Sequence, residues 1–292
     1  MFVKIIGEES PIETIELEKP TNTLTIKQTV DRVLVDTTIK EVAVIGDIHG
    51  TTKFIDGYNH ILKHNNHVNK IIVMGDHFDP YDDIPFDTMV GRYNEFIECM
   101  KSDDRIISLL GNHDLSKYII YNDETSRSEI FHTHVKKLSN LIESNLDKSR
   151  LIYECNGYLF SHAGVSEYWV NTVTEPEGFN FEKLKKVGWT EYELCSIAKY
   201  SIQDFSRWGN SPYQGPTWIR PTMLAKHPYG NYHQVVGHTM ICIEQNREFC
   251  FGGSDFNVEK SENGFYKVKM INDKDLWFVD NEGKSEYLVL SL

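Results

Sequence analysis

The sequence has no hydrophobic run long enough to span a membrane, because no apolar stretch approaches the ~20 residues that a spanning helix needs. Its first nine residues also lack the long apolar region and the cleavage site of a secretory signal peptide. We therefore expect a cytoplasmic protein with no membrane partner. The 292 residues, of which 40% are hydrophobic and 25% charged, are enough to bury a full globular core.

Paired cysteines are also missing. No C-x-x-C pair occurs, and the five cysteines are widely spaced, namely Cys99, Cys155, Cys195, Cys242 and Cys250. A disulfide framework or a cysteine-based zinc site needs closer and regular spacing. We interpret the cysteines as free thiols in a reducing compartment.

The chain has no surplus of basic residues. Its 43 acidic residues exceed its 30 basic ones, which gives a formal net charge of −13. Broad binding to a phosphate backbone needs clustered Lys and Arg, so an extended nucleic acid is not an expected partner. Carboxylates that bind metal ions are offset locally by the bound cations, and the net charge therefore says less about a single site.

What the first half of the chain does have is an alternation of apolar runs and amphipathic segments. Strands are predicted over 42–45, 71–74 and 106–110, with helices over 51–65 and from Asp87 between them. This order predicts a parallel sheet with right-handed crossovers. Ligand sites in such sheets lie outside the carboxyl ends of the strands.

The remaining segments complete the expected organisation. Residues 1–40 form a β-rich N-terminal extension in this interpretation, with a hairpin or an added sheet edge over 23–39, and residues 41–292 form one domain. A helix is predicted over 128–145, and the Thr190–Glu193 capping box predicts another that runs to about residue 207. Short strands over 265–270, 276–279 and 287–290 predict a second sheet packed on the first.

Polar residues of the kind that binds metal ions follow five apolar runs. In chain order they are Asp47 and His49, Asp76, Asn112, His162 and His238. Since strand ends of this kind meet along one edge of a sheet, we expect a single site there.

Around these residues the chain contains five short segments, in the order Gly46-Asp47-Ile48-His49-Gly50, Gly75-Asp76-His77-Phe78-Asp79, Gly111-Asn112-His113-Asp114, Ser161-His162-Ala163-Gly164 and Gly237-His238-Thr239. Their order and residue types resemble the calcineurin-like metallophosphoesterases. Within that family they are most similar to the phosphoprotein phosphatase type, which includes Ser/Thr phosphatases and diadenosine tetraphosphatase-like proteins of bacteria and phages. The resemblance covers about residues 42–239. It implies that 41–292 is an α/β domain, a four-layer αββα sandwich with two mixed β-sheets.

The resemblance also implies two divalent metal ions, with Mn expected and Fe or Zn as alternatives. The ligands that it assigns are Asp47 and His49 for the first metal, Asp76 as the bridge, and Asn112, His162 and His238 for the second. Two such ions about 3.5–4 Å apart lower the pKa of a bridging water and neutralise phosphoryl oxygens. Oxygen and imidazole ligands without a thiolate suit these metals.

Two further residues take catalytic roles by the same resemblance. His113 would donate a proton to the leaving oxygen, and Asp79 would orient it. The chemistry needs a general acid with a pKa near neutral, which a carboxylate partner can hold as imidazolium.

One departure concerns the substrate. The family pattern has an Arg directly after the Asp that Asp79 matches, whereas this chain continues with Pro80, Tyr81 and two acidic residues. Arg220, in Trp218-Ile219-Arg220-Pro221, resembles a W-x-R segment that supplies a substrate-binding Arg in phage and bacterial members. We therefore expect Arg220 to bind phosphate, since a guanidinium suits two phosphoryl oxygens.

The sequence thus predicts a dinuclear metal-dependent phosphatase that hydrolyses a phosphomonoester by metal-activated hydroxide. The expected partner is a phosphorylated substrate, either a Ser/Thr phosphoprotein or a nucleotide. His238 is followed two residues later by Met240, whereas phosphodiesterase members show a second His there. The alternatives are a hydrolase of diadenosine polyphosphates or RNA-end phosphates, and an inactive binding protein with this fold. Inactive members usually lose a ligand, and none is missing here.

Overall fold

The computed structural model describes residues 2–4, 14–16, 39–121, 129–177, 180–190, 193–194, 197, 210–241, 256–261, 264–280 and 287–292. The chain divides into two compact units, residues 1–39 and 40–292. In the first unit, β1 (Phe2–Lys4) pairs antiparallel with β2 (Thr14–Glu16). The hairpin expected over 23–39 falls, except for its last residue, outside the described residues, and the division at residue 40 into an extension and a domain stays a prediction.

A five-stranded sheet in the second unit carries the predicted strand–helix alternation. Its order is β13-β3-β4-β5-β6, and β3 through β6 run parallel. The strands are β3 (Glu41–Ile45), β4 (Lys70–Val73), β5 (Ile106–Leu109), β6 (Ser149–Arg150) and β13 (Leu288–Ser291). The connections between the first three contain α2 (Lys53–His64) and α3 (Phe86–Ser102). The predicted parallel sheet is confirmed.

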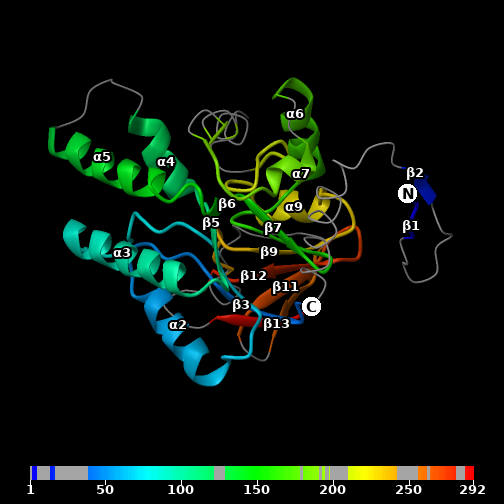
Figure 1. The fold of residues 1–292 in the computed structure, drawn as a ribbon, viewed down its shortest axis with the longest axis horizontal. Helices are drawn as coiled ribbons and strands as arrows, with labels where there is room; N and C mark the ends of the chain where they lie inside the picture. The colour runs from blue at the N-terminus through cyan, green and yellow to red at the C-terminus, as the bar shows by residue number, and fades with distance from the viewer. Residues whose placement is uncertain are drawn as a thin grey trace. The chain divides into compact units, whose positions relative to one another are not determined.

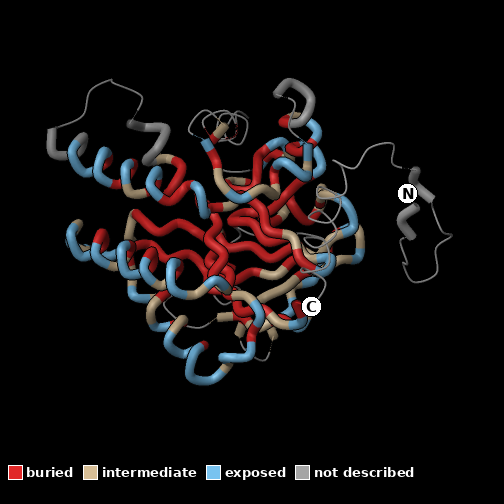
Figure 2. The backbone as a smooth tube through the Cα atoms, in the orientation of Figure 1, coloured by how far each residue is buried: buried red, intermediate tan, exposed pale blue. Residues whose placement is uncertain are grey.

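Burial on both faces explains why β3 is apolar at every position from Val42 to Ile45. These residues are at most 1% exposed. Phe54 and Ile61 of α2 and Phe96 of α3 share a core with Ile71 of β4. In Figure 1 both helices lie on the outer side of this sheet, and Figure 2 shows the central strands as the most buried part of the chain. A strand covered on both sides keeps no polar face.

The second sheet has six strands in the order β10-β11-β12-β9-β8-β7. They are β7 (Ile152–Cys155), β8 (Tyr158–Ser161), β9 (His233–Val236), β10 (Val258–Lys260), β11 (Tyr266–Lys269) and β12 (Asp275–Phe278). The β8–β9 and β9–β12 pairs are parallel and the other pairs are antiparallel. Figure 1 shows α6 (Glu167–Glu177), α7 (Phe181–Leu184) and α9 (Pro221–Lys226) on the side of this sheet away from α2 and α3. The two mixed sheets with outer helices confirm the predicted α/β sandwich.

The strand predicted at 287–290 is real, but its placement in the second sheet is wrong. It forms β13, which pairs antiparallel with β3, so that Leu288 lies opposite Val44 and Leu290 opposite Val42. An apolar run of this length does not specify which free strand edge it will join. The predicted strands at 265–270 and 276–279 do join the second sheet, as β11 and β12.

The helices outside these sheets follow the expected signals. The region after β5 contains α4 (Asn112–Tyr121) and α5 (Glu129–Glu143), and α5 confirms the helix predicted over 128–145. The capping box is also confirmed, since Thr190 N–H donates to Glu193 Oε2 at 3.0 Å and Glu193 N–H to Thr190 Oγ1 at 3.3 Å. Most of the helix that it was predicted to start lies outside the described residues.

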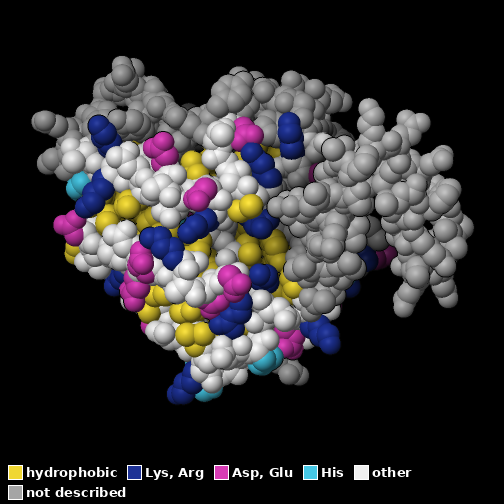
Figure 3. Space-filling view, viewed as in Figure 1, with side chains coloured by type: hydrophobic (Ala, Val, Ile, Leu, Met, Phe, Trp, Pro, Cys, Tyr) yellow, Lys and Arg dark blue, Asp and Glu magenta, His cyan; other side chains and the backbone are white. Residues whose placement is uncertain are grey.

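On the face shown in Figure 3, basic and acidic side chains of the described residues are interspersed, with hydrophobic atoms between them. The described residues on that face form no field of one sign. Among the described residues, no helix combines the length and the hydropathy that crossing a membrane requires.

Candidate metal centre

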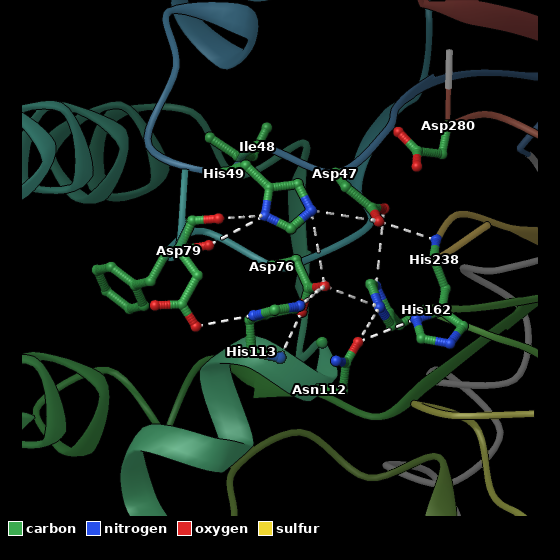
Figure 4. Close-up of polar contacts among 12 residues, drawn as sticks. Asp47, Ile48, His49, Asp76, Asp79, Asn112, His113, His162, His238 and Asp280 are labelled. Carbon is green, nitrogen blue, oxygen red and sulfur yellow. Dashed lines mark hydrogen bonds and ion pairs between the residues drawn. The ribbon is translucent and has the colours of Figure 1, made fainter. Parts of the chain in front are cut away.

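The ends of five strands bring the predicted ligands together. Asp47 and His49 follow β3, Asp76 follows β4, Asn112 starts α4 after β5, His162 follows β8 and His238 follows β9. The two sheets meet here, because the backbone N–H of His238 donates to Asp47 Oδ2 at 2.9 Å. Figure 4 shows the side chains converging on a common centre.

The backbone at these positions has an uncommon conformation. Four of the six described non-glycine residues with positive φ belong to the predicted site, namely His49 (46°), Asp76 (49°), Asp79 (60°) and His238 (59°). Left-handed backbone costs a non-glycine residue roughly 1–2 kcal/mol, and such strain gathers at functional sites. The left-handed conformation turns these side chains away from the strand direction and toward the centre. Gly111 and Gly237 lie so close to Asp76 and Asp47 that an added Cβ would overlap those carboxylates.

His49 presents one ring nitrogen to the carboxylates. Its Nδ1 lies 3.1 Å from the carbonyl oxygen of Phe78 and 3.0 Å from that of Asp79, so the proton belongs on Nδ1. Its Nε2 is the ring nitrogen left to bind a metal, and it lies 4.0 Å from Asp47 Oδ2 and 3.9 Å from Asp76 Oδ2. Fixing the tautomer through the other nitrogen is how proteins prepare a histidine to bind a metal.

His162 and His238 form the other half of the centre. His162 Nδ1 donates to the Met74 carbonyl oxygen at 2.8 Å, and its Nε2 lies 3.2 Å from Asp76 Oδ2. Asn112 Oδ1 lies 2.9 Å from His162 Nε2 and 3.0 Å from His238 Nδ1. The Asp76 carboxylate is therefore shared between two sets of possible ligands. One set also contains His162 and His238, and the other contains His49 and His113. Within each set the ligand atoms lie within 4.8 Å of one another. Asp47 belongs to neither set.

The crowding of buried carboxylates and imidazoles shifts their pKa values. Burial raises the pKa of Asp47 well above its usual range, and the nearby Asp280 raises it further. Burial also acts to raise the pKa of Asp76, but the attraction of His162 and other imidazoles outweighs it and lowers that pKa. Burial acts to lower the pKa of His162, yet Asp76 and Asp47 raise it to about 10. Without another cation, positive charge on His162 compensates these carboxylates.

Two buried atoms of the centre lack a hydrogen-bond partner among the described residues. Asp47 Oδ1 and His238 Nε2 have almost no exposed surface and make no hydrogen bond there. Leaving such atoms unpaired costs roughly 1–3 kcal/mol each, and a bound cation would satisfy them. The oxygen and imidazole donors without a thiolate suit Mn, Fe or Zn. The residues present therefore fit the two divalent ions expected from the sequence.

His113 and Asp79 form a hydrogen-bonded pair beside the centre. His113 Nδ1 lies 2.8 Å from Asp79 Oδ2, and its Nε2 is 3.9 Å from Asp76 Oδ2. Burial acts to lower the pKa of His113, but the hydrogen bond to Asp79 and the charge of Asp76 raise it overall. This geometry suits an imidazolium acid. It also places His113 Nε2 where it can serve as a ligand together with His49 and Asp76.

Arg220 lies at the His238 side of the centre. It precedes α9, and its Nη1 donates to Thr239 Oγ1 at 2.9 Å. The Trp218 ring is 5.6 Å from that of His238. A second arginine, Arg92, donates to the Gly50 carbonyl oxygen at 2.7 Å and supports the loop after β3.

Sequence reasoning missed a role for Asp114. Its buried carboxylate accepts hydrogen bonds from the backbone N–H groups of Asp76 (2.8 Å), His77 (2.8 Å) and Gly111 (2.9 Å). It thereby holds the loops after β4 and β5 together. In the sequence Asp114 has the signature of any acidic residue at a helix start, which hides this contact.

Asp280 was missed as well. It lies beside Asp47 in Figure 4 and is paired at 3.5 Å with Lys53, both side chains being nearly buried. Asp280 directly follows the apolar run 276–279, and Asp47 similarly follows the run 42–45 after a single glycine. The rule that found the other strand-end carboxylates could therefore have found this one.

Comparison with known families agrees with this geometry. The model of the calcineurin-like phosphoesterase family matches residues 40–242. The chain therefore belongs to the calcineurin-like phosphoesterase family and is a phosphate-ester hydrolase. No curated protein matches it.

Several solved structures are similar to the chain. A cold-active protein-tyrosine phosphatase of a psychrophile Shewanella species is 17% identical, with 82% of this chain and 80% of that one covered and a TM-score of 0.45. A putative diadenosine tetraphosphatase is 13% identical, with 87% and 94% covered and a TM-score of 0.35. A protein serine/threonine phosphatase from Saccharomyces cerevisiae is 11% identical, with 88% and 80% covered and a TM-score of 0.39. Likenesses this distant do not identify a substrate.

Proposed function

We propose that the chain is a dinuclear metal-dependent phosphatase that hydrolyses a phosphomonoester. The observation that carries the proposal is the shared carboxylate of Asp76. It belongs to two sets of ligand atoms, one with His49 and His113 and one with His162 and His238. One carboxylate between two groups of nitrogen and oxygen donors is the arrangement that a pair of ions needs. Manganese is the proposed metal, with iron or zinc as alternatives.

The proposed ligand set is divided between the sheets. Asp47 and His49 would hold one ion, Asp76 would bridge, and Asn112, His162 and His238 would hold the other. When bound, two such ions activate water for attack at phosphorus and neutralise phosphoryl oxygens. The chain's own part is to hold these ligands on strained strand ends, with the Nδ1 protons of His49 and His162 fixed by backbone carbonyls.

His113 would supply the proton for the leaving oxygen. Its hydrogen bond to Asp79 favours the imidazolium, and one-third exposure of its side chain leaves it open to substrate. Arg220, held by Thr239 at the other side, would orient the phosphoryl group through its guanidinium. The phosphoryl group would thus lie between His113, the proton donor, and the guanidinium of Arg220.

A monoester is favoured over a diester by the residues after β9. Met240, which is 36% exposed, stands two positions after His238. The diesterase pattern needs a second imidazole at that position. Hydrolysis of p-nitrophenyl phosphate and of bis(p-nitrophenyl) phosphate with Mn²⁺ tests this. We expect turnover of the monoester to exceed that of the diester by at least about tenfold in kcat/KM, a difference of about 1.4 kcal/mol in transition-state binding. Equal turnover of the two esters would contradict the monoester proposal. No turnover of either ester would contradict the proposed phosphatase activity.

A further inference from the structure

We propose that Tyr81 contacts the leaving group and selects phosphomonoesters that carry a basic side chain next to the phosphate, such as phosphopeptides with a neighbouring Lys or Arg. This inference rests on the proposed function, because it names the substrate class of that same site. The relevant loop connects Asp79 to α3 and contains Pro80 in place of the arginine of the family pattern.

One side of the Tyr81 ring contacts the centre, and the other side is exposed to solvent. Its ring centroid lies 4.5 Å from that of His49, with the ring planes tilted by 47°. Nevertheless, 75% of the residue is exposed, so a large aromatic surface remains available beside the proposed first metal.

The loop also reaches the proposed proton donor. Asp79, two residues before Tyr81, holds His113, and Figure 4 shows this pair on the opposite side of the centre from His238. The leaving oxygen must come close to His113 to receive its proton. The group attached to that oxygen therefore passes the loop that contains Tyr81.

The charge beside Tyr81 sets the kind of leaving group. Asp82 and Asp83 follow it directly, both are exposed, and neither forms an ion pair with a described cation. A neutral aromatic face beside carboxylates attracts a Lys or Arg side chain through cation–π and Coulomb interactions. Polyanions such as dinucleoside polyphosphates meet repulsion at the same loop.

The test uses the full chain loaded with Mn²⁺ and two serine peptides of equal length that carry a non-hydrolysable phosphonate. One has Arg and the other Glu on both sides of the phosphonate. We expect the Arg peptide to bind about tenfold more tightly than the Glu peptide. The ratio of the two Kd values should fall to about two or three in Tyr81→Ala and should be retained in Tyr81→Phe. The ratio is used because a general loss of binding cancels from it.

Two further variants sharpen the result. The double change Asp82→Asn and Asp83→Asn should also lower the ratio, and high salt should lower it in the unmodified chain. Tyr168→Ala removes another exposed tyrosine, on α6, and should leave the ratio unchanged. Equal binding of the two peptides, no binding of either, or an unchanged ratio in Tyr81→Ala overturns the inference. Hydrolysis of p-nitrophenyl phosphate is measured separately, and its absence overturns the proposed function even where the peptide preference is present.

Discussion

His113 faces both a carboxylate partner and the centre. If it is the proton donor, His113→Asn should lower kcat by about 10²–10⁴ for an alkyl phosphomonoester, whose leaving oxygen needs a proton. The loss should be much smaller for p-nitrophenyl phosphate, because nitrophenolate leaves without protonation. Metal content measured on the purified variant should stay at the level of the unmodified chain. A variant that loses metal would show instead that His113 is a ligand.

Asp114 shows how a residue outside the proposed chemistry can support it. Asp114→Asn keeps the shape but turns an amide N–H₂ toward one of the three backbone donors that the carboxylate accepts from. We expect the free energy of unfolding in urea to fall by about 1–3 kcal/mol. Asp87→Asn, at an exposed carboxylate on α3, serves as the control and should change it by less than about 0.5 kcal/mol. Equal stability of the two variants would contradict the role of Asp114 in holding the loops after β4 and β5 together.

The convergence of these residues could be predicted from the sequence because they lie at strand ends. Asp47, Asp76 and His162 follow buried apolar runs, and the structure places them together. The contacts that Asp114 makes with the loop after β4 could not be predicted, since those two backbone partners lie 38 and 37 residues earlier in the chain. Either His113 Nε2 or Asp47 could face a metal ion. The choice depends on side-chain geometry, which the spacing of residues along the sequence does not encode.

Among the elements, β13 closes one edge of the five-stranded sheet. Leu288 is buried to 2% exposure where it lies opposite Val44, whereas the adjacent Val289 is only half-buried. We expect Leu288→Ala to lower the free energy of unfolding by about 2–5 kcal/mol through the cavity that it leaves. Val289→Ala should cost about 1 kcal/mol or less. Chemical denaturation of both variants checks this, and equal losses would contradict the register.

A polar cluster joins α2 to the loop between α3 and β5. Arg105 Nε and Nη2 donate to the Asp103 carboxylate at 2.9 and 2.7 Å, and the Tyr58 hydroxyl donates to it at 3.1 Å. The hydrogen bonds from Arg105 lower the pKa of Asp103 below its usual value. A lowered carboxyl pKa stabilises the fold above the unfolded pKa of about 3.9, and this contribution is lost as the pH falls through the folded value.

Asp103→Asn should therefore cost about 1–2 kcal/mol at neutral pH, and the gap between variant and unmodified chain should narrow below about pH 4. Denaturation with urea over a series of pH values measures the gap. A gap that is independent of pH would show that the hydrogen bonds, and not the charge, stabilise this junction.

Element types were predictable from periodicity, but the partners of the C-terminal strands were not. The run at 276–279 and the run at 287–290 look alike in the sequence. One pairs with β9 and the other with β3, in different sheets. The choice is made by long-range packing, through Leu288 and Leu290 against the outer edge of β3.

In the whole molecule, the two sheets meet at the candidate centre. Asp47, His49, Asp76 and Asn112 come from the five-stranded sheet, and His162 and His238 come from the six-stranded sheet. Ions held by both groups would bind the folded chain and not the unfolded one. Metal binding should therefore stabilise the entire domain by mass action, by about 2.7 kcal/mol at a free metal concentration 100 times Kd.

The most direct measurement compares the unmodified chain with Asp76→Asn, because Asp76 is the proposed bridge. Metal content, the rise in Tm on adding Mn²⁺, and hydrolysis of p-nitrophenyl phosphate are measured on both. The unmodified chain should bind two ions, rise in Tm and hydrolyse the ester. The variant should bind at most one ion, rise less in Tm and turn over at least about 10²-fold more slowly. Equal metal content and equal turnover in the two proteins would contradict the shared-carboxylate centre.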